Sequence, residues 1–341
     1  MADNLHGGPD ALGVAAHDFS TNANSCGPCP DAVQALQAAH AQQYPDPAYT
    51  ALRARLGVFH GVDAARIVPA GSASEFIHRI SAHAARRGLR HAVLPDHSYG
   101  DYAQAARVWG LTISRRLALE GPAPALHWAC EPSSPLGRAD PALAQWLACA
   151  QPGPHLHVLD CAYQPLRLDG QRSALPAGAW QVWTPNKALG MTGVRAAYAI
   201  APEGAQADVE ALLALAPSWV VGAHGVAFLE AWTLPAVQQW LAASRVQLAQ
   251  WKTAQIALCA ALGWQIEAGS LANYLVARWP QAEAARMGAR LAWLRREHGI
   301  KLRDTGSFAL AGAVRLGVLP PASQQALARA WQAAELLDGN T

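Results

Sequence analysis

The chain has 341 residues, of which 52% are hydrophobic and 15% are charged. This composition supplies enough apolar side chains for a large buried core and excludes an intrinsically disordered chain. The 26 Lys and Arg residues nearly balance the 24 Asp and Glu residues, so a nucleic-acid-binding protein with a concentrated basic patch is not expected either.

The start of the chain predicts no export signal. The first 25 residues contain Asp3, Asp10 and Asp18 and no Lys or Arg, whereas a secretory signal begins with basic residues before an apolar stretch. The longest uncharged runs, 141–159 and 211–229, are interrupted by Pro and Gly and favour buried elements over a membrane span. We therefore expect a cytoplasmic protein with reduced cysteines and no membrane partner.

Helix and strand patterns alternate through the first two thirds of the chain. Residues 1–30 are rich in Gly, Pro, Asn and Asp and predict an irregular arm. Strands that alternate with helices need crossover connections, so the pattern predicts an α/β fold whose mostly parallel sheet is covered by helices. The predicted helices are 31–43, 48–59, 74–87 and 99–109, and the predicted strands are 67–70, 91–94, 111–115, 156–159, 179–183 and 195–200.

The pattern changes after Trp219, where long amphipathic helices surround short strands. This change predicts a second, smaller α+β lobe, as expected because one core stops growing at roughly 250–300 residues. We expect an N-terminal arm and helix (1–45), a large lobe (46–230) and a small C-terminal lobe (231–341). The elements predicted for the small lobe are helices 220–262 and 282–298 and strands 265–267, 273–278, 301–303 and 312–318.

One of the three lysines stands out by its position. Lys252 lies in a helical pattern and Lys301 begins a polar strand, so both are expected in solvent. Lys187 follows a strand in a Gly-rich turn, and ligands of open parallel sheets bind beyond the carboxyl ends of strands. An amine that loses hydration there has a lowered pKa and can form a Schiff base. By spacing alone, a surface-loop lysine is equally compatible.

Two further segments carry groups that can bind a charged ligand. Asp160 ends a strand, and a carboxylate there can keep a pyridine nitrogen protonated, with Tyr163 three residues later. A simple turn cap is the alternative for Asp160. Residues 69–75 form a strand, a glycine turn at Gly71 and a helix start, which can bind a phosphate; Ser74 could instead be only a helix cap.

Together these segments resemble the fold-type I pyridoxal-phosphate enzymes of aminotransferase class I/II, in the branch of histidinol-phosphate aminotransferase and threonine-phosphate decarboxylase. The strongest match is the block TPNKALGMTGVR, residues 184–195. The resemblance implies pyridoxal 5'-phosphate as cofactor, with Lys187 as its Schiff-base residue, Asp160 on the pyridine nitrogen and Tyr163 on the ring hydroxyl. It also implies a set of phosphate and ring contacts: Gly71, Ser72, Ala73, Thr184, Asn186, Arg195 and the stacking residue Tyr99. An aromatic side chain that packs at a helix start is the alternative for Tyr99.

The resemblance also implies substrate and subunit contacts. Tyr44 lies in a segment like the one that reaches the cofactor phosphate of the neighbouring subunit, which implies a homodimer. Arg315 matches the arginine that binds the substrate carboxylate, for which a planar guanidinium is suited. Arg303 on the adjoining strand is a second candidate. A surface ion pair is the alternative for each arginine, and without the resemblance it is the preferred interpretation of Arg303. Asn24 belongs to an arm like the one that covers the substrate.

Two features depart from this pattern. Ser134 stands where the family has an asparagine on the ring hydroxyl, so this contact is expected through water or to be left to Tyr163. Cys26 and Cys29 have the spacing of a redox dithiol, but no apolar strand precedes them, which disfavours that role. The 13 histidines show no metal-binding spacing, so no metal is expected.

We therefore predict a pyridoxal-phosphate-dependent aminotransferase that acts on a small amino acid or a phosphorylated amino compound, with an amino donor and a keto acid as substrates. The motifs His6-Gly7-Gly8 and Asp18-Phe19-Ser20 resemble threonine-phosphate decarboxylase of cobalamin synthesis, so a decarboxylase is the alternative. A non-catalytic binding protein with the aminotransferase fold is an alternative of a different class.

Overall fold

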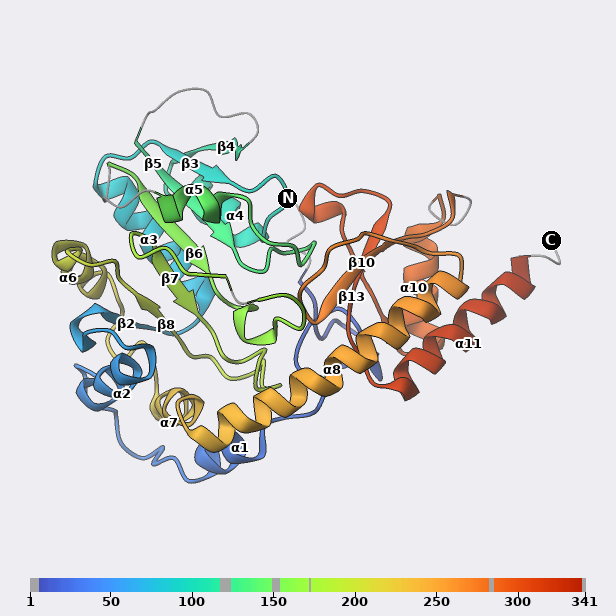
Figure 1. Ribbon diagram of the computed structural model, residues 1–341, viewed down its shortest axis with the longest axis horizontal. Coiled ribbons are helices and arrows are strands. Elements are labelled where there is room, and N and C mark those ends of the chain that lie inside the picture. The colour runs from blue at the N-terminus through green and yellow to red at the C-terminus, as the bar shows by residue number, and fades with distance from the viewer. Residues whose placement is uncertain (1–5, 117–123, 149–153, 172, 282–284, 339–341) are drawn as a thin grey trace.

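The computed structural model describes residues 6–116, 124–148, 154–171, 173–281 and 285–338. Figure 1 shows a large lobe built on one sheet, a smaller lobe beside it, and one long helix that runs from beneath the first lobe to the second. No helix among these described residues is both long enough and apolar enough to cross a membrane.

The large lobe is built on a seven-stranded sheet of order β2-β8-β7-β6-β5-β3-β4. Only β8 runs against its neighbours, so the mostly parallel sheet predicted from the sequence is confirmed. The strand β5 had no prediction, and it supplies a central position in the sheet. The strands are β2 (Ile67–Ala70), β3 (His91–Leu94), β4 (Thr112–Arg115), β5 (Ala125–Cys130), β6 (Leu156–Asp160), β7 (Trp180–Trp183) and β8 (Ala197–Ile200).

Helices cover both faces of this sheet, because its strands are apolar on both sides. One face packs on α3, α4 and α6 around Phe76, Ile80 and Trp128. The other packs on α1, α2, α7 and the start of α8 around Leu56 and Phe228. The helices are α1 (Pro30–Gln37), α2 (Thr50–His60), α3 (Ala73–Arg86), α4 (Gly100–Val108), α5 (Ala142–Ala148), α6 (Gln206–Ala214) and α7 (Ala223–Trp232), with 3-10 turns η1 (Ala64–Arg66) and η3 (Gln164–Leu166).

Two helix predictions were wrong in their extent. The first helix stops at Gln37 rather than at residue 43, because residues 38–43 are mostly exposed and have no buried face to pack. The helix predicted over 220–262 is two helices, α7 and α8 (Pro235–Ala261), since Pro235 lacks the N–H that a continuous helix would need and instead begins α8.

The small lobe contains an antiparallel sheet of order β12-β13-β10-β9. The tryptophans Trp264, Trp279 and Trp331 pack together in its core, with ring centroids 4.7–5.4 Å apart. The strand predicted at 301–303 is divided between β11 and β12. The elements are β9 (Gln265–Ile266), β10 (Tyr274–Arg278), α10 (Met287–Glu297), β11 (Ile300–Lys301), β12 (Arg303–Asp304), η4 (Gly306–Phe308), β13 (Ala313–Gly317) and α11 (Pro321–Asp338).

The N-terminal arm contacts both lobes. Its strand β1 (His17–Asp18) pairs in parallel with β11 of the small lobe, whereas α1 packs on α7 of the large lobe. Lys301 donates to the carbonyl of Gly8 at 2.6 Å and lies 3.0 Å from Asp10, so it anchors the arm. The expectation that Lys301 lies free in solvent was therefore wrong.

Three buried or half-buried histidines in the large lobe are held neutral. Burial lowers the pKa of His60, which contacts the Tyr198 hydroxyl at 2.7 Å, to about 4. Burial, and then the charge of neighbouring histidines, lowers the pKa of His127 to about 3 and that of His157 to about 4. The rings of His127 on β5 and His157 on β6 lie against each other and against that of His155.

These histidines predict acid sensitivity. Since their pKa values are lower in the folded chain than the usual 6.5, the unfolded chain binds more protons between about pH 6.5 and pH 4. The contribution of these histidines to the free energy of unfolding should be fully present above about pH 7 and fall as the pH drops through this window. Urea unfolding at pH 7.5, 6 and 5 measures the fall, which should become smaller in His127→Gln and stay unchanged in the exposed control His40→Gln. Equal pH dependence in all three proteins would contradict this.

Candidate active site

The loops that follow β6 and β7 place three of the predicted site residues together. Asp160 ends β6, Tyr163 follows it, and the Lys187 amine lies 5.1 Å from the centre of the Tyr163 ring. The Asn22 amide of the arm lies 3.4 Å from the Tyr163 hydroxyl. The carboxyl ends of β2, β3 and β5 lie at the same edge, because these strands run parallel to β6 and β7.

The turn that carries Lys187 is fixed by the arm. The backbone N–H of Asn24 donates to the Lys187 carbonyl at 2.8 Å, and its side-chain amide donates to the Ala188 carbonyl at 2.9 Å. Gly190 has φ +67°, and a Cβ there would lie 2.5 Å from the carbonyl oxygen of Gly27. The Asn24 side chain is therefore bonded to the turn itself, and Lys187 projects half-buried from a rigid backbone.

Asp160 is a buried carboxylate with two donors. The Tyr102 hydroxyl donates to Oδ2 at 2.6 Å, and the backbone N–H of Ala162 donates to Oδ1 at 2.9 Å. Tyr102 is fully buried and stacks on Trp128 with ring centroids 4.4 Å apart. Burial and the charge of Asp160 raise the Tyr102 pKa, so the phenol stays protonated and keeps donating. The two donors together fix the orientation of the Asp160 carboxylate.

The glycine turn after β2 leads into the N-terminus of α3. Ser72 caps this helix by accepting from the Glu75 N–H at 3.0 Å, so the cap predicted at Ser74 lies two residues earlier. Ala73 and Ser74 precede the first intrahelical donor, Phe76, and their N–H groups are of the kind that bind phosphate. Glu75 accepts from the Gly71 N–H at 3.1 Å, which fixes the turn.

Three further phosphate candidates follow β7. Thr184 and Asn186 are buried and bonded to each other, with the hydroxyl 3.0 Å from the amide oxygen. Arg195 precedes β8 and is exposed, and it has no ion-pair partner among the residues that the structure describes. Its guanidinium is thus available to an anion.

The Ser134 side chain contacts the small lobe. Its hydroxyl accepts from Nη1 of Arg315 at 3.2 Å, and its peptide bond to Pro135 is cis. The loop is held from behind by two buried carboxylates. Glu131 accepts from Arg167 at 2.5 Å, and Asp140 accepts from Arg116 at 2.6 Å.

Arg315 and Arg303 lie side by side on paired strands of the small lobe. Arg315 is buried, its Nη2 donates to the carbonyl of Ser20 at 3.0 Å, and its Nε has no partner among the described residues. Arg303 donates to Ser307 at 2.7 Å, and the centre of the Phe308 ring lies 4.9 and 5.3 Å from the guanidinium carbons of Arg303 and Arg315. Burial, and then the charge of Arg315, lowers the Arg303 pKa to about 10. These two adjacent cations are a candidate site for an anion.

Tyr99 and Tyr44 occupy different places. Tyr99 caps α4 and meets Tyr102 edge to face at 5.8 Å, so it borders the site near Asp160. Tyr44 is 76% exposed on the outer surface and stacks on Trp219 at 4.2 Å. The chain therefore does not bring Tyr44 to its own site.

The cysteines of the arm differ from a reactive dithiol. Cys29 is buried and begins α1, and Cys26 is half-buried; both thiols are free. Burial raises the pKa of each thiol, whereas redox dithiols have a lowered one.

Sequence reasoning missed three residues that contact the candidate site residues: Asn22, Tyr102 and Tyr274. Tyr102 lies three positions after Tyr99, so both are on one helical face, and this spacing is a signal that could have identified it. Tyr274 begins β10, its ring centroid lies 4.7 Å from that of Tyr163, and it lies under Arg315. No local signal marked it.

Comparisons with known proteins show which family and which fold this chain matches. The family model for aminotransferase class I and II matches residues 14–333. Histidinol-phosphate aminotransferase from Ruegeria pomeroyi is 28% identical over 320 residues, which cover 88% of this chain and 86% of that one. The same enzyme from Paramagnetospirillum magneticum is 27% identical over 322 residues, with the same coverage.

Two solved structures show the same fold. One is histidinol-phosphate aminotransferase from Sinorhizobium meliloti in complex with pyridoxal-5'-phosphate, with a TM-score of 0.77, 21% identity and coverage of 98% of both chains. The other is L-threonine-O-3-phosphate decarboxylase from Porphyromonas gingivalis, with a TM-score of 0.75, 19% identity and coverage of 92% of this chain and 98% of that one.

The close contact between the arm and the Lys187 turn predicts that alanine substitutions at two glycines with nearly the same φ lower the free energy of unfolding by different amounts. Gly61 has φ +66°, and a Cβ added there would meet no atom within 4 Å, so Gly61→Ala should cost only the left-handed strain, about 1–2 kcal/mol. Gly190→Ala adds the close approach to Gly27 and should cost at least about 1 kcal/mol more. Urea unfolding measures both, and equal costs would contradict the tight contact.

Proposed function

Because the chain belongs to the aminotransferase class I and II family, we propose that Lys187 is the residue that binds pyridoxal phosphate covalently in the transamination of a small amino acid or phosphorylated amino compound. Family membership makes the protein a pyridoxal-phosphate-dependent aminotransferase, which uses an amino donor and a keto acid. The observation that carries the proposal is the grouping of the Lys187 amine, the Tyr163 ring and the buried Asp160 at one sheet edge.

The residues at this edge fit the cofactor. Asp160, oriented by the Tyr102 hydroxyl, would hold the pyridine nitrogen, and Tyr163 would hold the ring hydroxyl. Two buried polar atoms near these residues, Oδ1 of Asn22 and Nε of Arg315, have no partner among the described residues, as expected where a polar ligand binds. The phosphate would be held by the N–H groups at the start of α3 with Thr184, Asn186 and Arg195, and Tyr99 would lie against the ring.

The side chains of this chain divide the chemical work. When bound, the cofactor supplies an electron sink for negative charge at the substrate Cα. Lys187 is the tethered amine that would remove the Cα proton and deliver it to the cofactor rather than back to Cα, as transamination requires. Arg315 would hold the substrate carboxylate through Nε, with its Nη groups already fixed by Ser134 and Ser20.

Decarboxylation is the second candidate. The histidine of the His6-Gly7-Gly8 segment lies at the edge of the site, with its ring centroid 6.0 Å from that of Tyr99 and its Nε2 4.0 Å from Asp101. The placement of the carboxylate by Arg315 would decide whether a proton or carbon dioxide leaves Cα.

The covalent role of Lys187 has a direct test. Purified protein loaded with pyridoxal phosphate should show a visible absorbance band that borohydride removes, and the reduced protein should carry the label on the peptide that contains residue 187. Lys187→Ala should lack the band and turn over about 10²–10⁴-fold more slowly, whereas Lys301→Ala should keep the band. A label on another lysine would overturn the assignment.

The reaction type is tested on the same preparation. Histidinol phosphate with 2-oxoglutarate should give glutamate, and O-phospho-L-threonine alone should give no carbon dioxide. Release of carbon dioxide without a keto acid would favour the decarboxylase. A spectrum that no amino compound changes would favour the non-catalytic protein.

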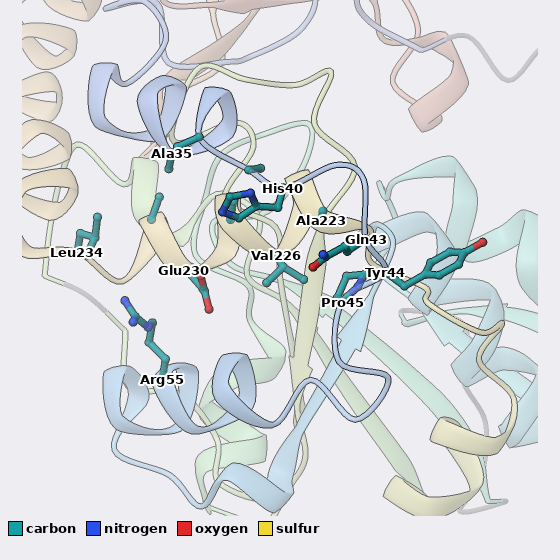
Figure 2. Close-up of a pocket in the computed structure, with 14 residues that line it drawn as sticks. Ala35, His40, Gln43, Tyr44, Pro45, Arg55, Ala223, Val226, Glu230 and Leu234 are labelled. Atoms are coloured by element: carbon teal, nitrogen blue, oxygen red, sulfur yellow. The ribbon is translucent and has the colours of Figure 1, made fainter.

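We further propose a homodimer in which Tyr44 reaches the neighbouring site. A groove of about 450 Å³ lies between α1, α2 and α7, and Figure 2 shows the Tyr44 ring at one end of it, directed away from Ala35 and Leu234. The groove is lined mostly by apolar side chains, and the exposed Tyr44–Trp219 stack adjoins it. A second copy of this chain is the occupant that would cover these rings and use the phenol.

Mixing two inactive variants tests this arrangement. Tyr44→Ala and Lys187→Ala should each have low activity, because each lacks one part of every site. Coexpressed, they should regain about a quarter of the wild-type sites, since half of the dimers are mixed and each has one complete site. Activity that does not rise above the sum of the separate variants would show that Tyr44 acts elsewhere.

A further inference from the structure

Lys252 is a buried cation that the proposed chemistry does not use. It lies in the middle of α8 and is only 8% exposed, so the expectation of a solvated lysine was wrong. Its ammonium donates to the carbonyls of Ser270 at 2.5 Å and Ala272 at 2.8 Å, and to the Ser270 hydroxyl at 3.3 Å. Burial lowers its pKa to about 8, and the charge of Asp169 opposes this shift.

Burying an ammonium removes its hydration, which destabilises the folded chain. Here hydrogen bonds to three neutral oxygen atoms, rather than to a contacting carboxylate, replace the lost water. All three oxygens belong to one short segment, residues 270–272, which precedes β10. The ammonium therefore holds this segment against α8.

The segment held by Lys252 packs against the loop that carries Ser134. The N–H of Leu271 donates to the Gly137 carbonyl at 2.7 Å, and the Leu271 carbonyl accepts from Leu168 at 2.7 Å. Gly137 has φ +71°, and a Cβ there would lie 2.5 Å from the Ser270 hydroxyl. No side chain fits between the two loops, so displacement of one displaces the other.

The same segment places Tyr274. The Ser270 hydroxyl donates to the Tyr274 carbonyl, and the Tyr274 hydroxyl donates to the Ser133 carbonyl at 2.8 Å. The Tyr274 ring contacts Tyr163 and lies 5.6 Å from the guanidinium carbon of Arg315. The position of residues 270–274 thus determines the surroundings of the proposed carboxylate-binding arginine.

We propose that Lys252 is a positioning residue of the active site: its ammonium fixes residues 270–272 to α8, and this segment fixes Ser134 and Tyr274 against Arg315. The structural part of the proposal is independent of the reaction, whereas its effect on substrate binding rests on the proposed function.

Hydrogen–deuterium exchange tests the structural part without any substrate. In Lys252→Met, peptides that cover 131–140 and 267–275 should exchange about tenfold faster than in the wild type, because the Leu271–Gly137 contact loosens. Thr253→Met, which adds the same side chain on the exposed face of α8, should exchange like the wild type. Faster exchange confined to α8, or spread evenly over the chain, would overturn the proposal.

Steady-state kinetics tests the consequence for substrate binding. The assay uses histidinol phosphate or O-phospho-L-threonine, whichever the wild type turns over. The varied substrate is the amino acid or keto acid whose carboxylate Arg315 would bind. In Lys252→Met, KM for the carboxylate-bearing substrate should rise about tenfold while kcat stays within about twofold, since the loosened loops affect Arg315 and leave Lys187 in place. Lys252→Gln, which keeps two N–H donors, should fall between the wild type and Lys252→Met. A loss confined to kcat would overturn the proposal, and absence of turnover in the wild type would count against the proposed function while leaving the exchange result decisive.

Discussion

The hydrogen bond from Tyr102 to Asp160 is the interaction on which the proposed chemistry depends. Asp160 ends a buried strand, and the phenol at 2.6 Å sets the orientation of its carboxylate. The position of this phenol is itself fixed by stacking on Trp128 inside the sheet core. Packing of the large lobe thereby fixes the direction of the carboxylate that would hold a pyridine nitrogen.

The other buried charges around the proposed site are likewise held in place by hydrogen bonds or ion pairs. Glu131 and Asp140 are paired with arginines behind the Ser134 loop, and Arg315 is oriented by Ser134 and Ser20. Pairs of this kind add little net stability, but they restrict the geometry because an unpaired partner would be costly. The site is consequently rigid on the side where a carboxylate would bind.

Neither lobe is sufficient for this site. The large lobe supplies Lys187 and Asp160, the small lobe supplies Arg315, and the arm crosses between them to fix the Lys187 turn. The helix α8 joins the two lobes, and in our proposal Lys252 makes it part of the site. In our proposal, the groove beside Tyr44 extends the same principle to a second subunit.

The sequence by itself determined the alternation of strands and helices, the mostly parallel sheet, and the Lys187 turn, because local periodicity and short motifs record backbone geometry. It did not reveal Tyr102 on Asp160, Tyr274 under Arg315, or the burial of Lys252. Each of these depends on contacts between segments that are far apart in the chain, and a lysine or tyrosine on a helix has the same local pattern whether its tip meets water or a buried carbonyl. Only the tertiary structure decides that, since burial and partners are set by packing rather than by neighbours in the chain.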